Sequence, residues 1–219
     1  MRRYLYFTVF ISGLCSLALE MTGSRLLEST FGSSNLVWAA VIGLILIYLA
    51  VGYFLGGKWA DRSASHALFY RILIAAALSI AVIPLVAKPI LNLASRAFDQ
   101  LQFGVLGGAF AVVIVLMAVP VILLGTASPF AIRLAVRDSR TIGSVSGRIY
   151  AISTLGSFVG TFLPPLILIP LAGTSLTFLI ISAALLLTAI VGLMLTNFSV
   201  RSLPILLTPV FLLAAGFWL

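Results

Sequence analysis

The ionisable residues of the first apolar segment are the first candidates for chemistry in this sequence. Glu20 lies about 24 Å along the segment that begins near Tyr4, at about 1.5 Å of rise per helical residue. A charged group at the centre of a spanning helix costs up to about 2.5–3.5 kcal/mol on insertion scales, so Glu20 is expected to face protein or water. Ser24, Arg25 and Glu28 follow, and the last two can pair on one helix face. Two interpretations stay open: a polar site for a cation contact or a proton relay, or a structural ion pair between the first two spans.

A second cluster is the stretch Gly56-Gly57-Lys58-Trp59-Ala60-Asp61-Arg62. Asp61 is placed to accept hydrogen bonds from backbone amides at the start of the next span, or to pair with a basic residue nearby. Lys58, Asp61 and Arg62 therefore predict a latch between helices at the inner face. A gating role is the alternative.

The third cluster is basic. It consists of Arg133, Arg137, Arg140 and Arg148, with Tyr150 close behind. Such a stretch fixes topology and contacts anionic lipid headgroups. The more specific interpretation is a docking surface for an acidic cytoplasmic partner.

Known catalytic patterns are missing from the sequence. It contains no glycine-rich dinucleotide loop, Walker loop, His-Glu-x-x-His motif or nucleophile elbow. One cysteine, Cys15, and one histidine, His66, exclude an internal disulfide and a metal site rich in either residue. We therefore expect no catalysis by this chain, and no cofactor or metal.

The composition indicates the elements that must position these clusters. Of the 219 residues, 62% are hydrophobic and 8% are charged, and the mean hydropathy is +1.25. A soluble domain is about 45–50% apolar and about 25% charged, so this chain must face lipid. A soluble enzyme, a disordered protein and a nucleic-acid-binding domain are excluded. The net charge of +8 then reflects an excess of Lys and Arg on the cytoplasmic side.

The hydropathy pattern predicts one all-α domain, 1–219, a polytopic bundle of about seven transmembrane helices. An N-terminus in the cytoplasm puts ten of the thirteen Lys and Arg inside, leaves Arg25, Lys88 and Arg96 outside, and places the C-terminus outside. The first segment is expected to be a retained helix, with a signal-anchor role as the alternative. The spans are expected at about 4–25, 35–57, 68–91, 104–126, 148–170, 174–197 and 203–219.

Other features concern packing. Pro164-Pro165 is the sharpest candidate for a kink. The stretch 92–103 is either an amphipathic surface helix or a plain connector, and the inner loop is expected around 133–147. Small residues four apart let helices approach closely, within the chain or in a homo-oligomer. Such pairs are Gly52/Gly56, Gly104/Gly108, Gly143/Gly147 and Gly156/Gly160.

Two stretches carry a resemblance to a known family. The first runs from Ala18-Leu19-Glu20-Met21 through Ser24-Arg25-Leu26-Leu27 and Phe31-Gly32-Ser33-Ser34 to Asp61-Arg62. The second joins Leu124-Gly125-Thr126-Ala127-Ser128-Pro129 to Gly147-Arg148-Ile149-Tyr150-Ala151 and Leu168-Ile169-Pro170-Leu171. The chain resembles the membrane half of bacterial spermidine synthase-like membrane proteins, the fused major-facilitator/spermidine synthases. Its Gly56–Arg62 order is also similar to the loop between the second and third helices of major-facilitator transporters.

The resemblance implies a multi-pass protein of the bacterial cytoplasmic membrane. In that family a soluble aminopropyltransferase-like domain usually follows, and we expect it to be a separate chain or to be lost. The favoured function is a non-catalytic membrane subunit or anchor that docks a separate protein, either a soluble synthase-like chain or other membrane subunits. The alternatives are a small amine or cation transporter that uses Glu20, and an accessory structural subunit of a larger complex.

Overall fold

The computed structural model describes residues 2–32, 35–101, 105–136 and 138–196 of the chain. Every regular element in these residues is a helix, so the all-α fold class is confirmed for them. In chain order the elements are α1 (Arg2–Phe31), α2 (Asn35–Arg62), α3 (His66–Leu101), α4 (Val105–Gly125), α5 (Ala127–Ala135), η1 (Ser139–Thr141), α6 (Ile142–Leu163), η2 (Pro164–Leu168) and α7 (Ile169–Met194).

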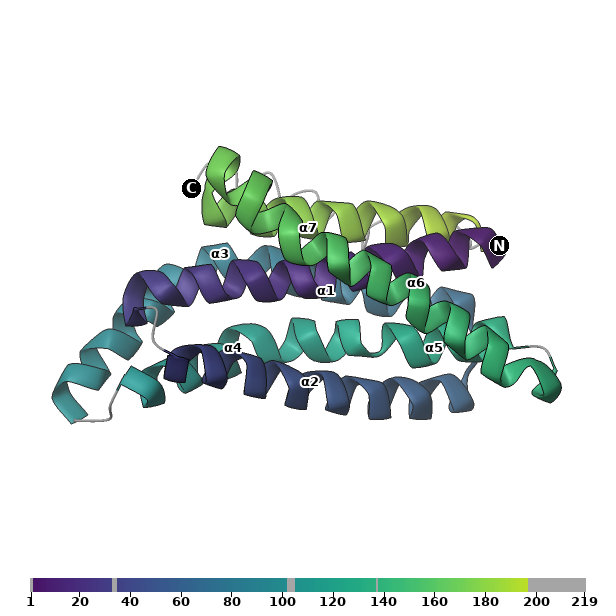
Figure 1. The fold of residues 1–219 in the computed structure, drawn as a ribbon, viewed down its shortest axis with the longest axis horizontal. Helices are drawn as coiled ribbons and strands as arrows, with labels where there is room; N and C mark the ends of the chain where they lie inside the picture. Colours follow the sequence, from purple (N-terminus) through teal and green to yellow (C-terminus); the bar gives the residue numbers. More distant parts are fainter. Residues whose placement is uncertain (1, 33–34, 102–104, 137, 197–219) are drawn as a thin grey trace.

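The long helices lie side by side along one axis, and most of them alternate in direction (Figure 1). The most extensive contacts are those of α1 with α6, α2 with α4 and α3 with α7. Helices α2, α4 and α5 form one side of the bundle and α7 lies on the other, while α6 crosses the bundle obliquely between the α7 side and the end of α5 (Figure 1). The N-terminus, the end of α2 and the starts of α3 and α6 therefore meet at one end.

Five helical stretches are long and apolar enough to cross a membrane: Arg2–Phe31, Val41–Arg62, His66–Ala94, Gly107–Ala135 and Ser139–Met194. Large apolar side chains on the surface of the bundle suit lipid better than water. Phe54, Leu166 and Leu171 are 72%, 69% and 83% exposed.

The last of the five stretches contains a reversal, which falls between the predicted spans 148–170 and 174–197. Its 56 residues exceed the roughly 17–25 that one crossing needs. Gly173 has φ +77° and ψ 171°, a backbone conformation that glycine adopts without strain. The chain turns back there, and the rest of α7 returns toward the N-terminal end (Figure 1).

Two expected boundaries are wrong. The inner loop predicted around 133–147 is mostly helical, because α5 continues to Ala135 and α6 already begins at Ile142. The buried side chains of Phe130 and Ala131 explain why the chain stays helical beyond Thr126. The stretch 92–103 is no separate helix, since α3 runs unbroken to Leu101. The predicted span 203–219 lies outside the described residues.

Glycines bring two pairs of helices into backbone contact. A Cβ on Gly156 would overlap the carbonyl oxygen of Phe10, and one on Gly160 would overlap that of Leu14, which explains the close packing of α6 on α1. On α2, Gly52 and Gly56 fit against Ile122 of α4 and against Thr126 in the same way. These two Gly-x-x-x-Gly pairs pack within the chain. Gly143 and Gly147 have nothing within 4 Å of an added Cβ, and Gly104 lies outside the described residues.

The paired prolines change the helix type. Residues Pro164–Leu168 form the single π-helical segment of the described chain, η2, between α6 and α7. Proline has no N–H to donate and its ring crowds the preceding turn, so the regular hydrogen-bond ladder cannot continue there. The expected distortion at Pro164-Pro165 is therefore present as a wider turn.

Candidate functional site

The polar residues predicted on the first span lie beside η2. A hollow of about 480 Å³ lies between α1, α2, η2 and the start of α7. Ser24, Arg25 and Glu28 line it together with Trp38 of α2, Pro165 and Pro170, so the structure brings three of the four predicted residues to one place. We call it the α1–η2 hollow.

The two charged residues of this hollow neutralise each other. Arg25 Nη1 donates to Glu28 Oε2 at 2.7 Å, and the two side chains are 58% and 38% exposed. The pair lies within α1 and does not join the first two spans, so the interpretation as an ion pair between spans is wrong. Ser24 is buried, and its hydroxyl has no hydrogen-bond partner among the described residues.

Glu20 does not belong to this cluster. Its side chain is half-buried, it does not line the hollow, and the structure records no hydrogen bond or ion pair for it within the described residues. It therefore remains the one acidic group of the apolar part of α1 without a described partner.

The residues of the predicted latch lie at the opposite end of the bundle. Asp61 Oδ1 lies 3.5 Å from Nε of Arg133, so the carboxylate pairs with α5. Both side chains are largely exposed, 77% for Asp61 and 50% for Arg133, and an ion pair of this kind contributes little stability. The Lys58 ammonium lies 6.0 Å from the centre of the Phe54 ring, one turn back on the same helix. Arg62 is exposed.

Basic residues gather at this end, which we call the basic end. Two acidic residues, Asp61 and Asp138, accompany them among the described residues. The predicted docking residue Arg137 lies outside the described residues, and the Tyr150 side chain is 54% exposed on α6. The described Lys and Arg of the basic end are Arg2, Arg3, Lys58, Arg62, Arg71, Arg133, Arg140 and Arg148.

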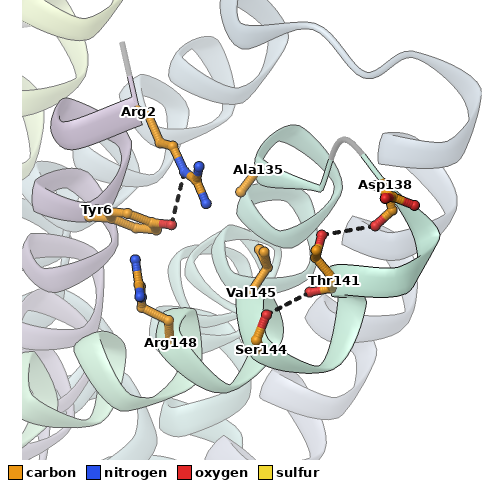
Figure 2. Close-up of a pocket in the computed structure, with 8 residues that line it drawn as sticks. All are labelled: Arg2, Tyr6, Ala135, Asp138, Thr141, Ser144, Val145 and Arg148. Atoms are coloured by element: carbon orange, nitrogen blue, oxygen red, sulfur yellow. Dashed lines mark hydrogen bonds between the residues drawn. The ribbon is translucent and has the colours of Figure 1, made fainter.

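The basic end contains a cavity that the sequence did not predict. It measures about 280 Å³ and lies between the first turns of α1, the end of α5 and the start of α6 (Figure 2). Arg2, Tyr6 and Arg148 line one part of it, and Asp138 and Thr141 line another. We call it the α1–α6 cavity. The spacing of Arg2 and Tyr6, four residues apart on one helix face, was the available signal.

Aromatic packing in the interior holds the helices of the basic end together. The Tyr4 hydroxyl donates to the carbonyl oxygen of Thr188 at 2.6 Å and so joins α1 to α7. The rings of Phe69 and Phe130 lie 5.7 Å apart and join α3 to α5. These contacts fix where the basic helix ends lie.

The described residues contain no group of three His, Cys, Asp or Glu side chains that is arranged to hold a metal ion. No protein-family model, curated protein or solved structure matches the chain. The function must therefore be argued from the geometry of the molecule.

Proposed function

We propose that this chain is a non-catalytic, multi-pass membrane subunit whose basic end lies in the cytoplasm and docks an acidic protein partner. The observation that carries the proposal is the uneven charge of the two ends. Eight described Lys and Arg meet two carboxylates at the basic end, and Asp61 is already paired with Arg133. Lys and Arg concentrate on the cytoplasmic side of membrane proteins, so the same asymmetry supports the orientation.

The proposed topology follows from the helices and the sequence together. The turn at Gly173 divides the longest helical stretch into two crossings, which gives six within the described residues. The apolar stretch 203–219 is the proposed seventh and places the C-terminus outside. The resemblance to the membrane half of bacterial spermidine synthase-like proteins favours a synthase-like soluble chain as the partner, in the bacterial cytoplasmic membrane.

The exposed charges suit docking through a broad surface. Arg62 and Arg140 project from different elements, and neither side chain has a described hydrogen bond or ion pair. Complementary charge steers association and selects partners, and it weakens as salt screens it. A partner bound here should carry an acidic patch and should dissociate as the ionic strength rises.

Affinity purification of the tagged protein after gentle detergent extraction, followed by mass spectrometry, tests the proposal. We expect a stoichiometric soluble partner with wild type, and about tenfold less of it with the double variant Arg62→Glu, Arg140→Glu. Lys88→Glu reverses an exposed charge at the opposite end and is the matched control. Stoichiometric membrane subunits, retained by the double variant, would instead indicate an accessory structural subunit.

Transport of an amine or another cation is the second candidate, because one observation favours it. Glu20 is half-buried in the apolar part of α1 without a described partner, and intramembrane carboxylates of this kind mark ion pathways. Flux into proteoliposomes tests this candidate. Transport requires that Glu20→Gln abolish the flux while the control Glu28→Gln, at a partly exposed carboxylate, retains it. Equal flux in the two variants rejects this candidate.

A further inference from the structure

The α1–α6 cavity brings two guanidinium groups together from distant parts of the sequence. Arg2 enters it from the first turn of α1 and Arg148 from the second turn of α6, and both side chains point into the same space (Figure 2). Two like charges that line one cavity repel each other, and an anion between them relieves the repulsion. The arrangement therefore favours a negatively charged ligand.

Arg2 is already oriented for such a ligand. Its Nε donates to the Tyr6 hydroxyl at 3.2 Å, and its guanidinium carbon lies 5.9 Å from the centre of the Tyr6 ring. This contact uses one of the five N–H donors of the guanidinium and leaves the others available. The Tyr6 hydroxyl accepts from Arg2 and keeps its own proton to donate.

Arg148 has its donors available as well. The structure records no hydrogen bond or ion pair for its side chain among the described residues. A guanidinium presents a planar fork of N–H groups that matches two oxygens of a phosphate or a carboxylate. Two forks that approach from different helices suit the tetrahedrally arranged oxygens of a phosphate better than the two oxygens of a carboxylate, which lie in one plane.

The start of α6 adds to the positive potential. This helix has 22 residues, and the side chain of its N-cap residue Thr141 makes no capping hydrogen bond. The N–H of Ile142, the first residue of α6, donates to the Ser139 carbonyl oxygen of η1, and the helix dipole still favours an anion at this end. The one carboxylate that lines the cavity, Asp138, accepts from the backbone N–H of Arg140 at 3.0 Å, beside η1.

We infer that the α1–α6 cavity is a binding site for a phosphate group, held by Arg2 and Arg148 and contacted by the Tyr6 hydroxyl. Its place at the end of the apolar part of α1, beside Val145 of α6, suits the phosphodiester of an anionic phospholipid, and free phosphate offers the same chemistry. The inference does not depend on the proposed docking function, because the ligand binds the purified chain without a protein partner.

Native mass spectrometry of the purified full chain in detergent tests the site, with phosphatidylglycerol and inorganic phosphate as separate probes. We expect one tightly bound phosphatidylglycerol, and a loss of affinity of about tenfold or more with Arg2→Gln and with Arg148→Gln. Arg3→Gln and Arg140→Gln are the matched controls. They remove the same charge from the same end, at residues that do not line the cavity. These controls should change the affinity by less than about threefold.

The two probes distinguish the source of the phosphate. Binding of phosphatidylglycerol with this variant pattern identifies a lipid site, whereas the same pattern with inorganic phosphate alone identifies a site for a soluble phosphate. Equal losses in cavity and control variants, or no binding of either probe, would overturn the inference. Arg2→Gln changes an exposed residue in the first turn of α1, and thermal unfolding of each variant in detergent verifies that it is folded.

Discussion

The two ends of the bundle use their charges in different ways. Near the α1–η2 hollow, Arg25 pairs with Glu28 three residues away on the same helix, and the pair is neutral. At the basic end the charges come from α1, α2, α3, α5, η1 and α6, and two acidic side chains accompany eight basic ones among the described residues. Charges that are balanced locally leave no net charge, whereas the surplus that the fold assembles from these six elements is the basis of the proposed anion site and docking surface.

At the basic end, the contacts that join the helices differ from the charged groups that are exposed on the surface. Its helices are joined by interior contacts, such as the hydrogen bond from Tyr4 to Thr188 and the packing of Phe69 on Phe130. Its ion pair, Asp61 with Arg133, lies on the surface. Stability at this end should therefore depend on apolar and backbone contacts, and binding should depend on the charges.

The largest effect is expected where α1 meets α6. Gly156→Leu would drive a side chain into the backbone of Phe10 and separate the two helices that carry Arg2 and Arg148. Because the obstacle is backbone, we expect a loss of about 3 kcal/mol or more in the free energy of unfolding, measured by denaturation in mixed detergent micelles. Gly147→Leu on the same helix meets open space and is the control. Equal losses in the two variants would contradict this account of the contact.

A smaller effect is expected from Tyr4. Tyr4→Phe removes the hydrogen bond to the Thr188 carbonyl oxygen and leaves the ring in place. The free energy of unfolding should fall by about 1 kcal/mol, since a buried acceptor loses its donor. Tyr150→Phe changes an exposed side chain and should leave stability unchanged within error. A loss for Tyr150→Phe as large as for Tyr4→Phe would show that the interior bond is not what joins α1 to α7.

The smallest effects are expected from the two surface ion pairs. A double-mutant cycle on Arg25 and Glu28 should give a coupling free energy of about 0.5 kcal/mol that falls with added salt. The same cycle on Asp61 and Arg133 should give less, because the atoms lie farther apart, at 3.5 Å against 2.7 Å. A larger coupling for Asp61 and Arg133 would show that this predicted latch between helices contributes more stability than a surface ion pair should.

Hydropathy was sufficient to predict the long apolar helices of the described residues, and it failed at some of their boundaries. The long apolar runs predict helices because lipid leaves no other partner for the backbone, and Pro164-Pro165 predicts a distortion because proline lacks a donor. The reversal at Gly173 falls between the predicted spans 148–170 and 174–197, although the sequence alone did not identify the glycine that makes it. The inner loop was predicted too long because Arg133 and Arg140 suggested exposure, although α5 buries Phe130 on its other face.

The candidate site was predictable only in part, because spacing along one helix can be read from the sequence and contacts between distant helices cannot. Residues close in sequence, such as Arg25 and Glu28, can be paired from their spacing. Arg2 and Arg148 meet only because α1 and α6 pack closely through Gly13, Gly156 and Gly160. Their meeting depends on which helices become neighbours, and hydropathy does not determine that.

The most direct test of the central claim is the side of the membrane on which the basic end lies. The native Cys15 is fully buried, so an introduced cysteine can be labelled against a low background. Ser63→Cys places a thiol between α2 and α3 at the basic end, and Ser29→Cys places one near the opposite end. A membrane-impermeant maleimide on intact cells should label Ser29→Cys, and should label Ser63→Cys only after permeabilisation. Labelling of Ser63→Cys but not Ser29→Cys in intact cells would contradict the account.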